Sequence, residues 1–454
     1  MSIKNVIEGG YCIGCGVCSA VDNNLKMKVN NYGFVEAYNS SRTDINPAAS
    51  RVCPFSDDSK NEDVIANEFL SKDCTSIDTY IGRYIQTFAG HVLESTFRQE
   101  GGSGGMGTWI LNELLVRNLI SCVIHVKDTV HSLDQGLQYE YAISRTKEDL
   151  LSGAKAKYYP ITLEKVLELV ASSSDTFAII GVPCFVKAIR LLQMENELYR
   201  IKVPFIGALF CGHLKSSLYA EYLGYQLGVK SNELKKINFR KKVVNSRADK
   251  YNTEATFLKG GVEHSIDKPT KKLFGTTWSY GFFKYKACDF CDDVTGETAD
   301  FSLGDAWIND YVNDFRGDNI VVTRNKIIND IILKAIDDRR LKLSEINKDL
   351  VFESQSGGFR HRRDGLAIRL SMNKKVWKPQ KRDYLLNNIS ALGARRERIY
   401  KLRYFISQKS VVFYLLLKKT NTLWFYRYLH VPFIELHKFL SGGGIINRVL
   451  KTIR

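Results

Sequence analysis

The chain has 454 residues, of which 44% are hydrophobic and 25% are charged, with a net charge of +16. This composition is that of an ordinary globular protein, and the length predicts two to four structural units rather than one small core. The positive charge is confined to the end of the chain: from Gly365 onward there are 19 Lys and Arg against three Asp and Glu, and the preceding residues carry equal numbers of both signs.

The two ends of the chain show neither the pattern expected of a secreted protein nor that of a membrane-spanning one. The first residues, MSIKNVIEGGY, lack the apolar stretch of a secretory signal peptide. The longest uncharged apolar run near the C-terminus, residues 410–417, is too short to span a bilayer. We therefore expect a cytoplasmic protein, in which ten clustered cysteines indicate metal or redox chemistry rather than disulfides.

Four cysteines near the start have the pattern of iron–sulfur ligands. Three form a C-x2-C-x2-C run, and the fourth stands in a Cys-Pro pair 35 residues later, as in bacterial ferredoxins. Glycines within the run permit a tight loop around the cluster. The alternative is a structural zinc site, although such sites usually contain two C-x2-C pairs. We predict a ferredoxin-like 4Fe-4S segment over residues 1–60. Its ligands are Cys12, Cys15, Cys18 and Cys53.

Strands and helices alternate after a polar stretch at residues 61–79. This alternation predicts an α/β protein with a largely parallel sheet covered by helices. The expected strands are 84–90, 122–126, 176–181 and 203–210, and the expected helices are 108–120, 162–173, 184–197, 216–228 and 323–338.

A glycine-rich stretch, residues 101–107, lies between an expected strand and an expected helix. Glycines let backbone N–H groups approach a phosphate, and the N-terminus of the helix adds its dipole. The stretch matches neither a Walker A motif nor a strict dinucleotide fingerprint. A flexible turn is the alternative interpretation.

A second set of four cysteines lies further along the chain. Two of them follow predicted strands at or before the start of a helix, and such positions share one edge of a parallel sheet. The other two form a C-x2-C pair, and together the four could hold a second cluster. The set is Cys184, Cys211, Cys288 and Cys291. Inert buried thiols or half a zinc site are the alternatives for the first two. Cys74 and Cys122 are expected to be non-ligands.

Seven stretches resemble, in order, the family of beta subunits of coenzyme F-420 hydrogenase and dehydrogenase, which includes the plant 7-hydroxymethyl chlorophyll a reductase. The resemblance covers residues 80–350, divided into an N-terminal region at 80–165 and a C-terminal region at 166–350. The stretches are GGSGGMGT, AKAKYY, GVPCFVKAIR, LFCGH, RKK, CDFCDD and ADFSLGDAW.

The resemblance implies an enzyme with FAD that passes electrons between 4Fe-4S clusters and an organic acceptor, with the second cysteine set as cluster ligands. It implies that Lys157 lies near the flavin or substrate and that Asp305 belongs to the catalytic site. It implies flavin-phosphate contacts for Ser103, Gly104, Gly105 and Thr108. Relatives usually read Cys-His-Gly where this chain has Cys-Gly-His, so His213 is expected to be a polar residue at a helix start rather than a proton donor.

The segment 365–454 interleaves Lys and Arg with aromatic residues. This composition suits the surface of an anionic membrane, and we expect peripheral contact at the inner face as one hypothesis. Nucleic acid is a second alternative, although no nucleic-acid module is recognisable. A helical extension packed on the body, or a surface for a protein partner, is the third.

These expectations combine into an iron–sulfur flavoprotein oxidoreductase. Electrons from a ferredoxin or similar donor would enter the first cluster and pass through the second to FAD. The acceptor would be the deazaflavin coenzyme or a substrate of surface-polysaccharide synthesis. A non-catalytic electron-transfer subunit of a larger redox complex is the main alternative, and a zinc-stabilised interaction protein is a weaker one.

Overall fold

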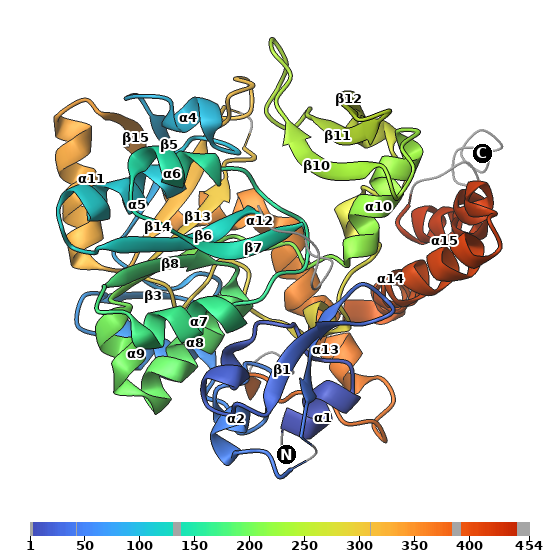
Figure 1. The fold of residues 1–454 in the computed structure, drawn as a ribbon, viewed down its shortest axis with the longest axis horizontal. Helices are drawn as coiled ribbons and strands as arrows, with labels where there is room; N and C mark the ends of the chain where they lie inside the picture. Colours follow the sequence, from blue (N-terminus) through green and yellow to red (C-terminus); the bar gives the residue numbers. More distant parts are fainter. Residues whose placement is uncertain (1–2, 42, 130–137, 309, 384–391, 443–454) are drawn as a thin grey trace.

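The computed structural model describes residues 3–41, 43–129, 138–308, 310–383 and 392–442. A large sheet with helices on both faces forms the body (Figure 1). The N-terminal segment lies below the body in this view, and a smaller sheet and a helical hairpin lie to its right.

The large sheet has eight strands in the order β15-β5-β14-β13-β9-β8-β6-β7. Its centre, β13-β9-β8-β6, is parallel, and antiparallel strands flank it on both sides. The strands are β5 (Gln86–Val92), β6 (Cys122–Asp128), β7 (Tyr139–Ser144), β8 (Phe177–Gly181), β9 (Phe205–Leu209), β13 (Phe301–Asp305), β14 (Asn319–Thr323) and β15 (Leu341–Glu345). The predicted α/β class with parallel central strands is confirmed.

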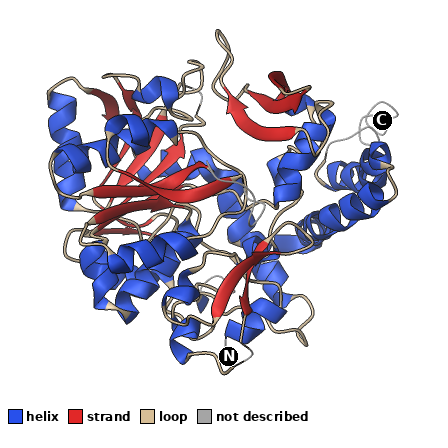
Figure 2. Cartoon of the chain, viewed as in Figure 1, coloured by secondary structure: helices blue, strands red, loops and turns tan. Residues whose placement is uncertain are grey.

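Alternate residues of the central strands point to opposite faces of the sheet, and each face is covered by helices (Figure 2). Ala178 and Phe205 belong to the core beneath one group of helices, whereas Ile179 and Ile206 belong to the core beneath the other. The first group is α4 (Phe97–Glu100), α5 (Met106–Val116), α6 (Lys147–Ser152) and α11 (Lys326–Asp337); the second is α7 (Glu164–Ser172), α8 (Pro183–Glu195) and α9 (Glu197–Lys202). The expected helices of this region are therefore present, with ends that shift by a few residues.

The N-terminal segment packs on the α7 and α8 side of the body. Val17 and Leu25 share a core with Leu163 and Val166, and the Leu163 N–H donates to the carbonyl oxygen of Cys15 at 2.8 Å. The elements are α1 (Ile3–Glu8), η1 (Val17–Ala20), β1 (Leu25–Val29), β2 (Val35–Asn39), α2 (Pro47–Arg51), α3 (Glu62–Leu70), β3 (Ser76–Asp78) and β4 (Gly82–Tyr84).

A three-stranded antiparallel sheet and the C-terminal helices form a further core. Tyr222, Phe283, Tyr414 and Tyr426 pack against one another in this core. Its elements are α10 (Ser217–Gln226), β10 (Leu234–Lys241), β11 (Asn252–Lys259), β12 (Val262–Pro269), η2 (Thr270–Lys272), η3 (Trp278–Tyr280), α14 (Gly393–Lys419), η7 (Leu423–Phe425) and α15 (Tyr426–Leu440). The helical C-terminal extension is confirmed. Among the described residues, no helix has both the length and the apolar character needed to cross a membrane.

The basic segment does not begin as a separate unit at Gly365, because its first part packs inside the body. Arg369 of α13 (Asp364–Ser371) is 1% exposed and donates to the carbonyl oxygen of Asp289 at 2.6 Å. Arg382 is 3% exposed. The preceding helix, α12 (Lys348–Arg362), connects the body to this packed part.

His430 makes the C-terminal core sensitive to acid. Its ring is fully buried among Phe282, Phe413 and Tyr426, and within the described residues neither ring nitrogen has a hydrogen-bond partner. Burial lowers the pKa of His430 to about 4, below its ordinary value of 6.5. The unfolded chain therefore takes up a proton between pH 6.5 and 4 that the folded chain does not, and stability is lost as the pH falls through this window.

We expect acidification from pH 7.5 to pH 5 to lower the free energy of unfolding by about 2 kcal/mol through this residue. Urea unfolding of His430→Phe at both pH values should show a pH dependence reduced by this amount. The same change at the exposed His264 serves as the control. An unchanged pH dependence in His430→Phe would contradict the assignment.

Candidate functional site

The first cysteine set surrounds one small cavity. The predicted ligands Cys12, Cys15 and Cys18 lie on the loop after α1 and on η1, and Cys53 follows α2. Tyr11 and Phe55 are among the residues that complete the wall. Burial raises the pKa of Cys53 to about 12 and raises the pKa of the other three thiols as well. The structure therefore brings all four predicted residues of this set together.

Two glycines in this loop are required by its shape. Gly14 and Gly16 have φ angles of +68° and +81°, and a Cβ at Gly16 would lie 2.3 Å from Oγ1 of Thr162. The loop also directs backbone donors at sulfur: the N–H groups of Gly14 and Ala37 lie 3.4 and 3.3 Å from Sγ of Cys12. Such hydrogen bonds stabilise negative charge on sulfur.

The second cysteine set also converges, from three separate parts of the chain. Cys184 stands in the first turn of α8, directly after β8, and Cys211 follows β9. Cys288 lies in η4 (Lys286–Phe290), and Cys291 follows it. Burial raises the pKa of Cys184, and Cys291, Cys211 and Cys288 raise it further, because their sulfur atoms are neighbours. The carboxyl ends of two parallel strands thus meet the C-x2-C pair, as the sequence predicted.

The two cysteine sets and a large cavity lie next to one another. The pKa of Cys184 is also raised by Cys15 of the first set, and Tyr141 lies close to both sulfur atoms. Tyr141 and Cys211 line a cavity of about 280 Å³ at the carboxyl ends of the central strands. Cysteines of both sets also belong to or pack against one core, so the two sets and the cavity lie in the same region of the molecule.

The glycine-rich loop forms one wall of this cavity, before the first residue of α5. Of the predicted phosphate contacts, Ser103, Gly105 and Thr108 line the cavity. Gly104 lies behind them, where a Cβ would come within 2.7 Å of the Gly90 carbonyl oxygen. In the described part of the chain, the N–H groups of residues 102–105 donate to no protein acceptor. Free N–H groups at a helix start can bind a phosphate, so the loop fits the cofactor that the sequence suggested.

The two predicted catalytic residues line the same cavity, and each is held by an ion pair. Lys157 Nζ lies 2.8 Å from Oδ1 of Asp128, and Asp305 Oδ2 lies 2.7 Å from Nη1 of Arg240. Burial lowers the pKa of Lys157, although Asp128 opposes this effect. Both residues are thus in position to contact a ligand of the cavity, and Arg240, which opens the resembling stretch RKK, is an additional charged residue of the site to which the sequence assigned no role.

His213 is not at a helix start, because α10 begins at Ser217. Its ring lines the cavity and packs against Trp278 with the ring centroids 4.4 Å apart. Burial lowers the pKa of His213 well below its ordinary value, and its Nε2 has no hydrogen-bond partner among the described residues. A buried polar atom without a partner is costly, which is a sign that a ligand supplies one.

Arg362 is a candidate site residue that sequence reasoning missed. It is 2% exposed, and its Nη1 lies 2.7 Å from Sγ of Cys291. Its Nη2 donates to the carbonyl oxygens of Cys211 and Gly212 at 2.7 and 2.8 Å. A buried guanidinium thus supplies positive charge directly at the second cysteine set.

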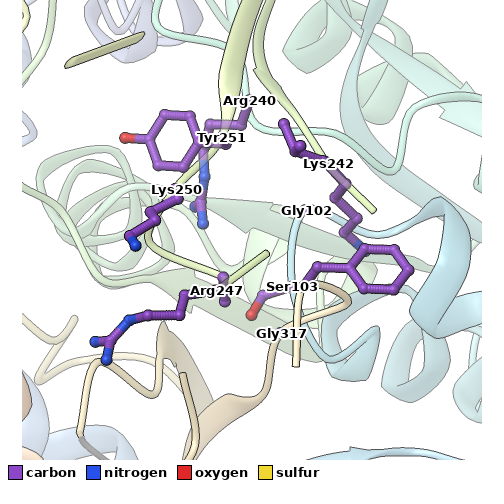
Figure 3. Close-up of a pocket in the computed structure, with 11 residues that line it drawn as sticks. Gly102, Ser103, Arg240, Lys242, Arg247, Lys250, Tyr251 and Gly317 are labelled. Carbon is purple, nitrogen blue, oxygen red and sulfur yellow. The ribbon is translucent and has the colours of Figure 1, made fainter. Parts of the chain in front are cut away.

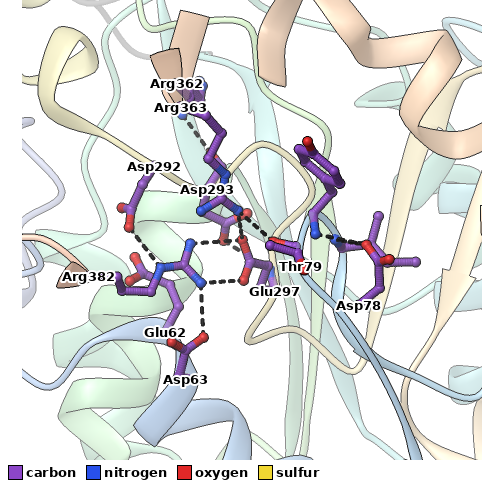
Figure 4. Close-up of polar contacts among 12 residues, drawn as sticks. Glu62, Asp63, Asp78, Thr79, Asp292, Asp293, Glu297, Arg362, Arg363 and Arg382 are labelled. Carbon is purple, nitrogen blue, oxygen red and sulfur yellow. Dashed lines mark hydrogen bonds and ion pairs between the residues drawn. The ribbon is translucent and has the colours of Figure 1, made fainter. Parts of the chain in front are cut away.

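A buried network of ion pairs holds the chain segment after Cys291 (Figure 4). Arg382 donates to both carboxylate oxygens of Glu297 at 2.7 and 3.0 Å and to Asp292 at 2.9 Å. Burial alone would raise the pKa of Asp292, but Lys381 and Arg382 hold it well below its usual range. The segment from α12 to Arg382 therefore places buried positive charges beside the second cysteine set. We call this segment, residues 348–382, the basic clamp.

Loss of one cation from the basic clamp should be costly. We expect Arg382→Met to lower the free energy of unfolding by about 3–5 kcal/mol, because it leaves the buried carboxylates of Asp292 and Glu297 undercompensated. Urea unfolding at pH 7 measures the change. Arg316→Met is the control, since Arg316 pairs with Asp314 at the surface and should cost less than about 1 kcal/mol. Equal losses in both variants would show that the network contributes no more than a surface pair.

Neither cysteine set is arranged around a single ion. Among the described residues, no three or more His, Cys, Asp or Glu side chains converge closely enough to hold one metal ion.

Comparison with known proteins agrees with the fold and the site. The beta-subunit N-terminal and C-terminal models of coenzyme F-420 hydrogenase/dehydrogenase match residues 87–168 and 174–349. An uncharacterized protein of Methanocaldococcus jannaschii is 25% identical over 257 residues, which cover 56% of this chain and 85% of that protein. One subunit of the F(420)H(2) dehydrogenase of Methanosarcina mazei is 23% identical over 303 residues, covering 66% of this chain and 77% of that protein.

A solved structure shares the fold. A chain in the F-420-reducing NiFe hydrogenase complex from Methanosarcina barkeri aligns with a TM-score of 0.50 and 19% identity, covering 68% of this chain and all of that one. Fold and matches together define an oxidoreductase class. The chain belongs to the family of coenzyme F-420 hydrogenase/dehydrogenase beta subunits, which confirms the resemblance seen in the sequence.

Proposed function

We propose that the chain is an iron–sulfur flavoprotein that carries electrons through two 4Fe-4S clusters to FAD and on to an organic acceptor. One observation carries the proposal: cysteines of both sets belong to or pack against one core, and Cys211 of the second set lies in the wall of a cavity with free backbone donors. Electron transfer needs short distances between redox groups, and this arrangement supports such a path.

When bound, the clusters would transfer single electrons, and a flavin would couple these one-electron steps to a two-electron reduction. The first set would hold one cluster through Cys12, Cys15, Cys18 and Cys53, and the second set would hold the other. Ser103, Gly105 and Thr108 would contact the flavin phosphates. Lys157 and Asp305, held by Asp128 and Arg240, would orient the ligand, and Trp278 would exclude water from one side of the cavity.

Anaerobic purification followed by quantification of iron, sulfide and flavin tests the proposal. Two 4Fe-4S clusters require about eight irons per chain, together with one FAD. Four irons and no flavin would support a simpler electron-carrying subunit. Zinc without iron would refute the proposal.

For the acceptor, the family and the relatives favour the deazaflavin coenzyme, with a ferredoxin or similar donor; a substrate of surface-polysaccharide synthesis is the second candidate. The relatives include a dehydrogenase subunit and a chain of a hydrogenase complex, which also supports the alternative of an electron-transfer subunit with a catalytic partner. Reduction of the deazaflavin coenzyme by the purified chain, with reduced ferredoxin as the electron donor and no other subunit present, would distinguish an enzyme from a subunit that needs its partner.

We also propose that the hairpin of α14 and α15 touches an anionic membrane surface. Trp424 and Tyr428 are 65% and 62% exposed, and Leu416 is 57% exposed beside Lys418 and Lys419. Exposed aromatic residues next to cations suit a headgroup layer. Flotation with vesicles containing phosphatidylserine should fall for the full chain carrying Trp424→Ser and Tyr428→Ser, and unchanged flotation would refute the contact.

A further inference from the structure

Lys215 is a buried cation in the wall of the large cavity, on the segment between β9 and α10. It is 2% exposed, and it lies outside all seven stretches that resemble the family. Cys211 of the second cysteine set stands four residues before it and lines the same cavity. Lys215 therefore belongs to the side of the cavity that adjoins the second cysteine set.

The other cations of the cavity wall differ from Lys215. Lys157 and Arg240 are each paired with a carboxylate, and Arg240 lines one small pocket together with Gly102 of the glycine-rich loop (Figure 3). Lys155 is exposed to solvent. For Lys215, no carboxylate lies within ion-pair distance in the part of the chain that the structure describes. The cavity thus holds a buried cation that lacks a counterion among the described residues.

The contacts of the Lys215 ammonium group compensate its charge only in part. Its Nζ donates to the carbonyl oxygen of Phe282 at 2.6 Å, and it lies 4.4 and 5.0 Å from the ring centroids of Tyr219 and Trp278. A carbonyl dipole and two aromatic rings attract a cation, but they carry no net charge that could neutralise it.

The chain opposite Lys215 adds a second positive charge. Lys284 faces Lys215 in an isolated antiparallel bridge, and its own Nζ lies 2.6 Å from Oδ1 of Asp289. Burial lowers the pKa of Lys215 well below its ordinary value and Lys284 lowers it further, whereas Cys288 opposes both effects. An anion in the cavity would stabilise the ammonium form, because a neighbouring opposite charge favours the charged state of a buried lysine.

His213 is a second indication that a ligand occupies this side of the cavity. Its Nε2 is buried without a hydrogen-bond partner among the described residues, and its ring, like Lys215, lies against Trp278. An anionic oxygen can accept hydrogen bonds from the ammonium group and from the Nε2–H tautomer of the imidazole. One negatively charged ligand group would therefore satisfy both side chains.

We propose that Lys215 is the counterion for a negative charge on the ligand of the large cavity and that it makes the cavity prefer anionic ligands. A ligand that takes up two electrons from the second cysteine set and one proton from water gains one negative charge, and no bond to Lys215 forms or breaks. Lys215 would then stabilise the reduced ligand relative to the oxidised one. This effect on reduction rests on the proposed function, whereas the preference for anions does not.

Benzoate and its neutral amide, benzamide, test the preference because they have the same shape and differ in charge. Titration calorimetry uses the full chain after removal of any bound flavin. The wild type should bind benzoate at least about tenfold more tightly than benzamide, because only the carboxylate forms a charge-assisted hydrogen bond. Lys215→Met should bind the two probes equally. Lys259→Met, which removes an exposed lysine of β11, should keep the preference.

Three results would overturn the counterion: equal affinities in the wild type, no binding of benzoate, or a preference that survives in Lys215→Met. Lys215→Gln, which keeps a hydrogen-bonding side chain without the charge, replaces Lys215→Met if that variant does not fold. It should bind the two probes equally as well.

A redox titration of the flavin-containing protein tests the effect on reduction. Lys215→Met should lower the midpoint potential of the bound flavin by at least about 30 mV, which corresponds to a tenfold change for a two-electron couple. A shift of a cluster potential with an unshifted flavin potential would assign Lys215 to the second cysteine set and overturn the proposal. A chain that never contains flavin but loses its benzoate preference in Lys215→Met would refute the redox proposal and leave the counterion standing.

Discussion

Replacing Arg362 with glutamine should lower the midpoint potential of the cluster proposed at the second cysteine set by on the order of 100 mV. Arg362 holds a positive charge 2.7 Å from Sγ of Cys291, and this charge favours the reduced, more negative cluster. A charge-assisted hydrogen bond contributes about 1.5–3 kcal/mol, and about 59 mV corresponds to a tenfold change for one electron. Removal of the charge therefore makes the site harder to reduce.

A redox titration monitored by electron paramagnetic resonance measures this shift in the full chain. Arg360→Gln is the matched control, because Arg360 is exposed on the same helix. The midpoint potential of the cluster in this variant should match that of the wild type. Arg362→Lys keeps the charge without the planar donor geometry and should shift the potential less. An unshifted potential in Arg362→Gln with full iron content would contradict the role of Arg362.

Single cysteine variants should each remove one cluster and leave the other. We expect Cys18→Ala to retain about four of eight irons with the signal of the second site, and Cys288→Ala to retain about four with the signal of the first. The reason is that each set supplies all four thiolate ligands of its own cluster. Iron quantification together with resonance spectra of both variants checks the result.

Cys74→Ala is the control for these variants. Cys74 is 1% exposed and so is buried like Cys18 and Cys288, but its sulfur donates to the carbonyl oxygen of Arg324 instead of facing a cysteine set. It should keep all its iron. Loss of all iron from either ligand variant would instead indicate one shared site.

Local sequence patterns predicted the strands and helices whose residues are close together in the sequence. Strand β8 and helix α8 follow from an apolar run and a helical period, and their junction places Cys184 at the sheet edge on sequence grounds alone. The convergence of Cys211 with Cys184 follows from the same rule. Motif spacing thus located most of the candidate site.

The residues that sequence reasoning missed act over long distances. Arg362 lies 71 residues beyond Cys291, outside every motif, and only the packing of α12 brings the two together. The antiparallel pair of β10 and β11 was missed for another reason: it combines alternating charged residues with bulges, which weakens the period-two signal. A buried charge whose partner lies far away in the sequence leaves no pattern in its own segment from which the pairing could be predicted.

The basic clamp has a consequence for how the protein is made. All residues that line the cavity of the first cysteine set lie between Ile3 and Phe55, so they leave the ribosome long before those of the second set. All cysteines of the second set have also emerged once residue 291 is synthesised, but their cation, Arg362, and the partner of Asp292 and Glu297, Arg382, have not. We therefore expect the nascent chain to mature its two sites in sequence, the N-terminal one first and the second only when translation is nearly complete.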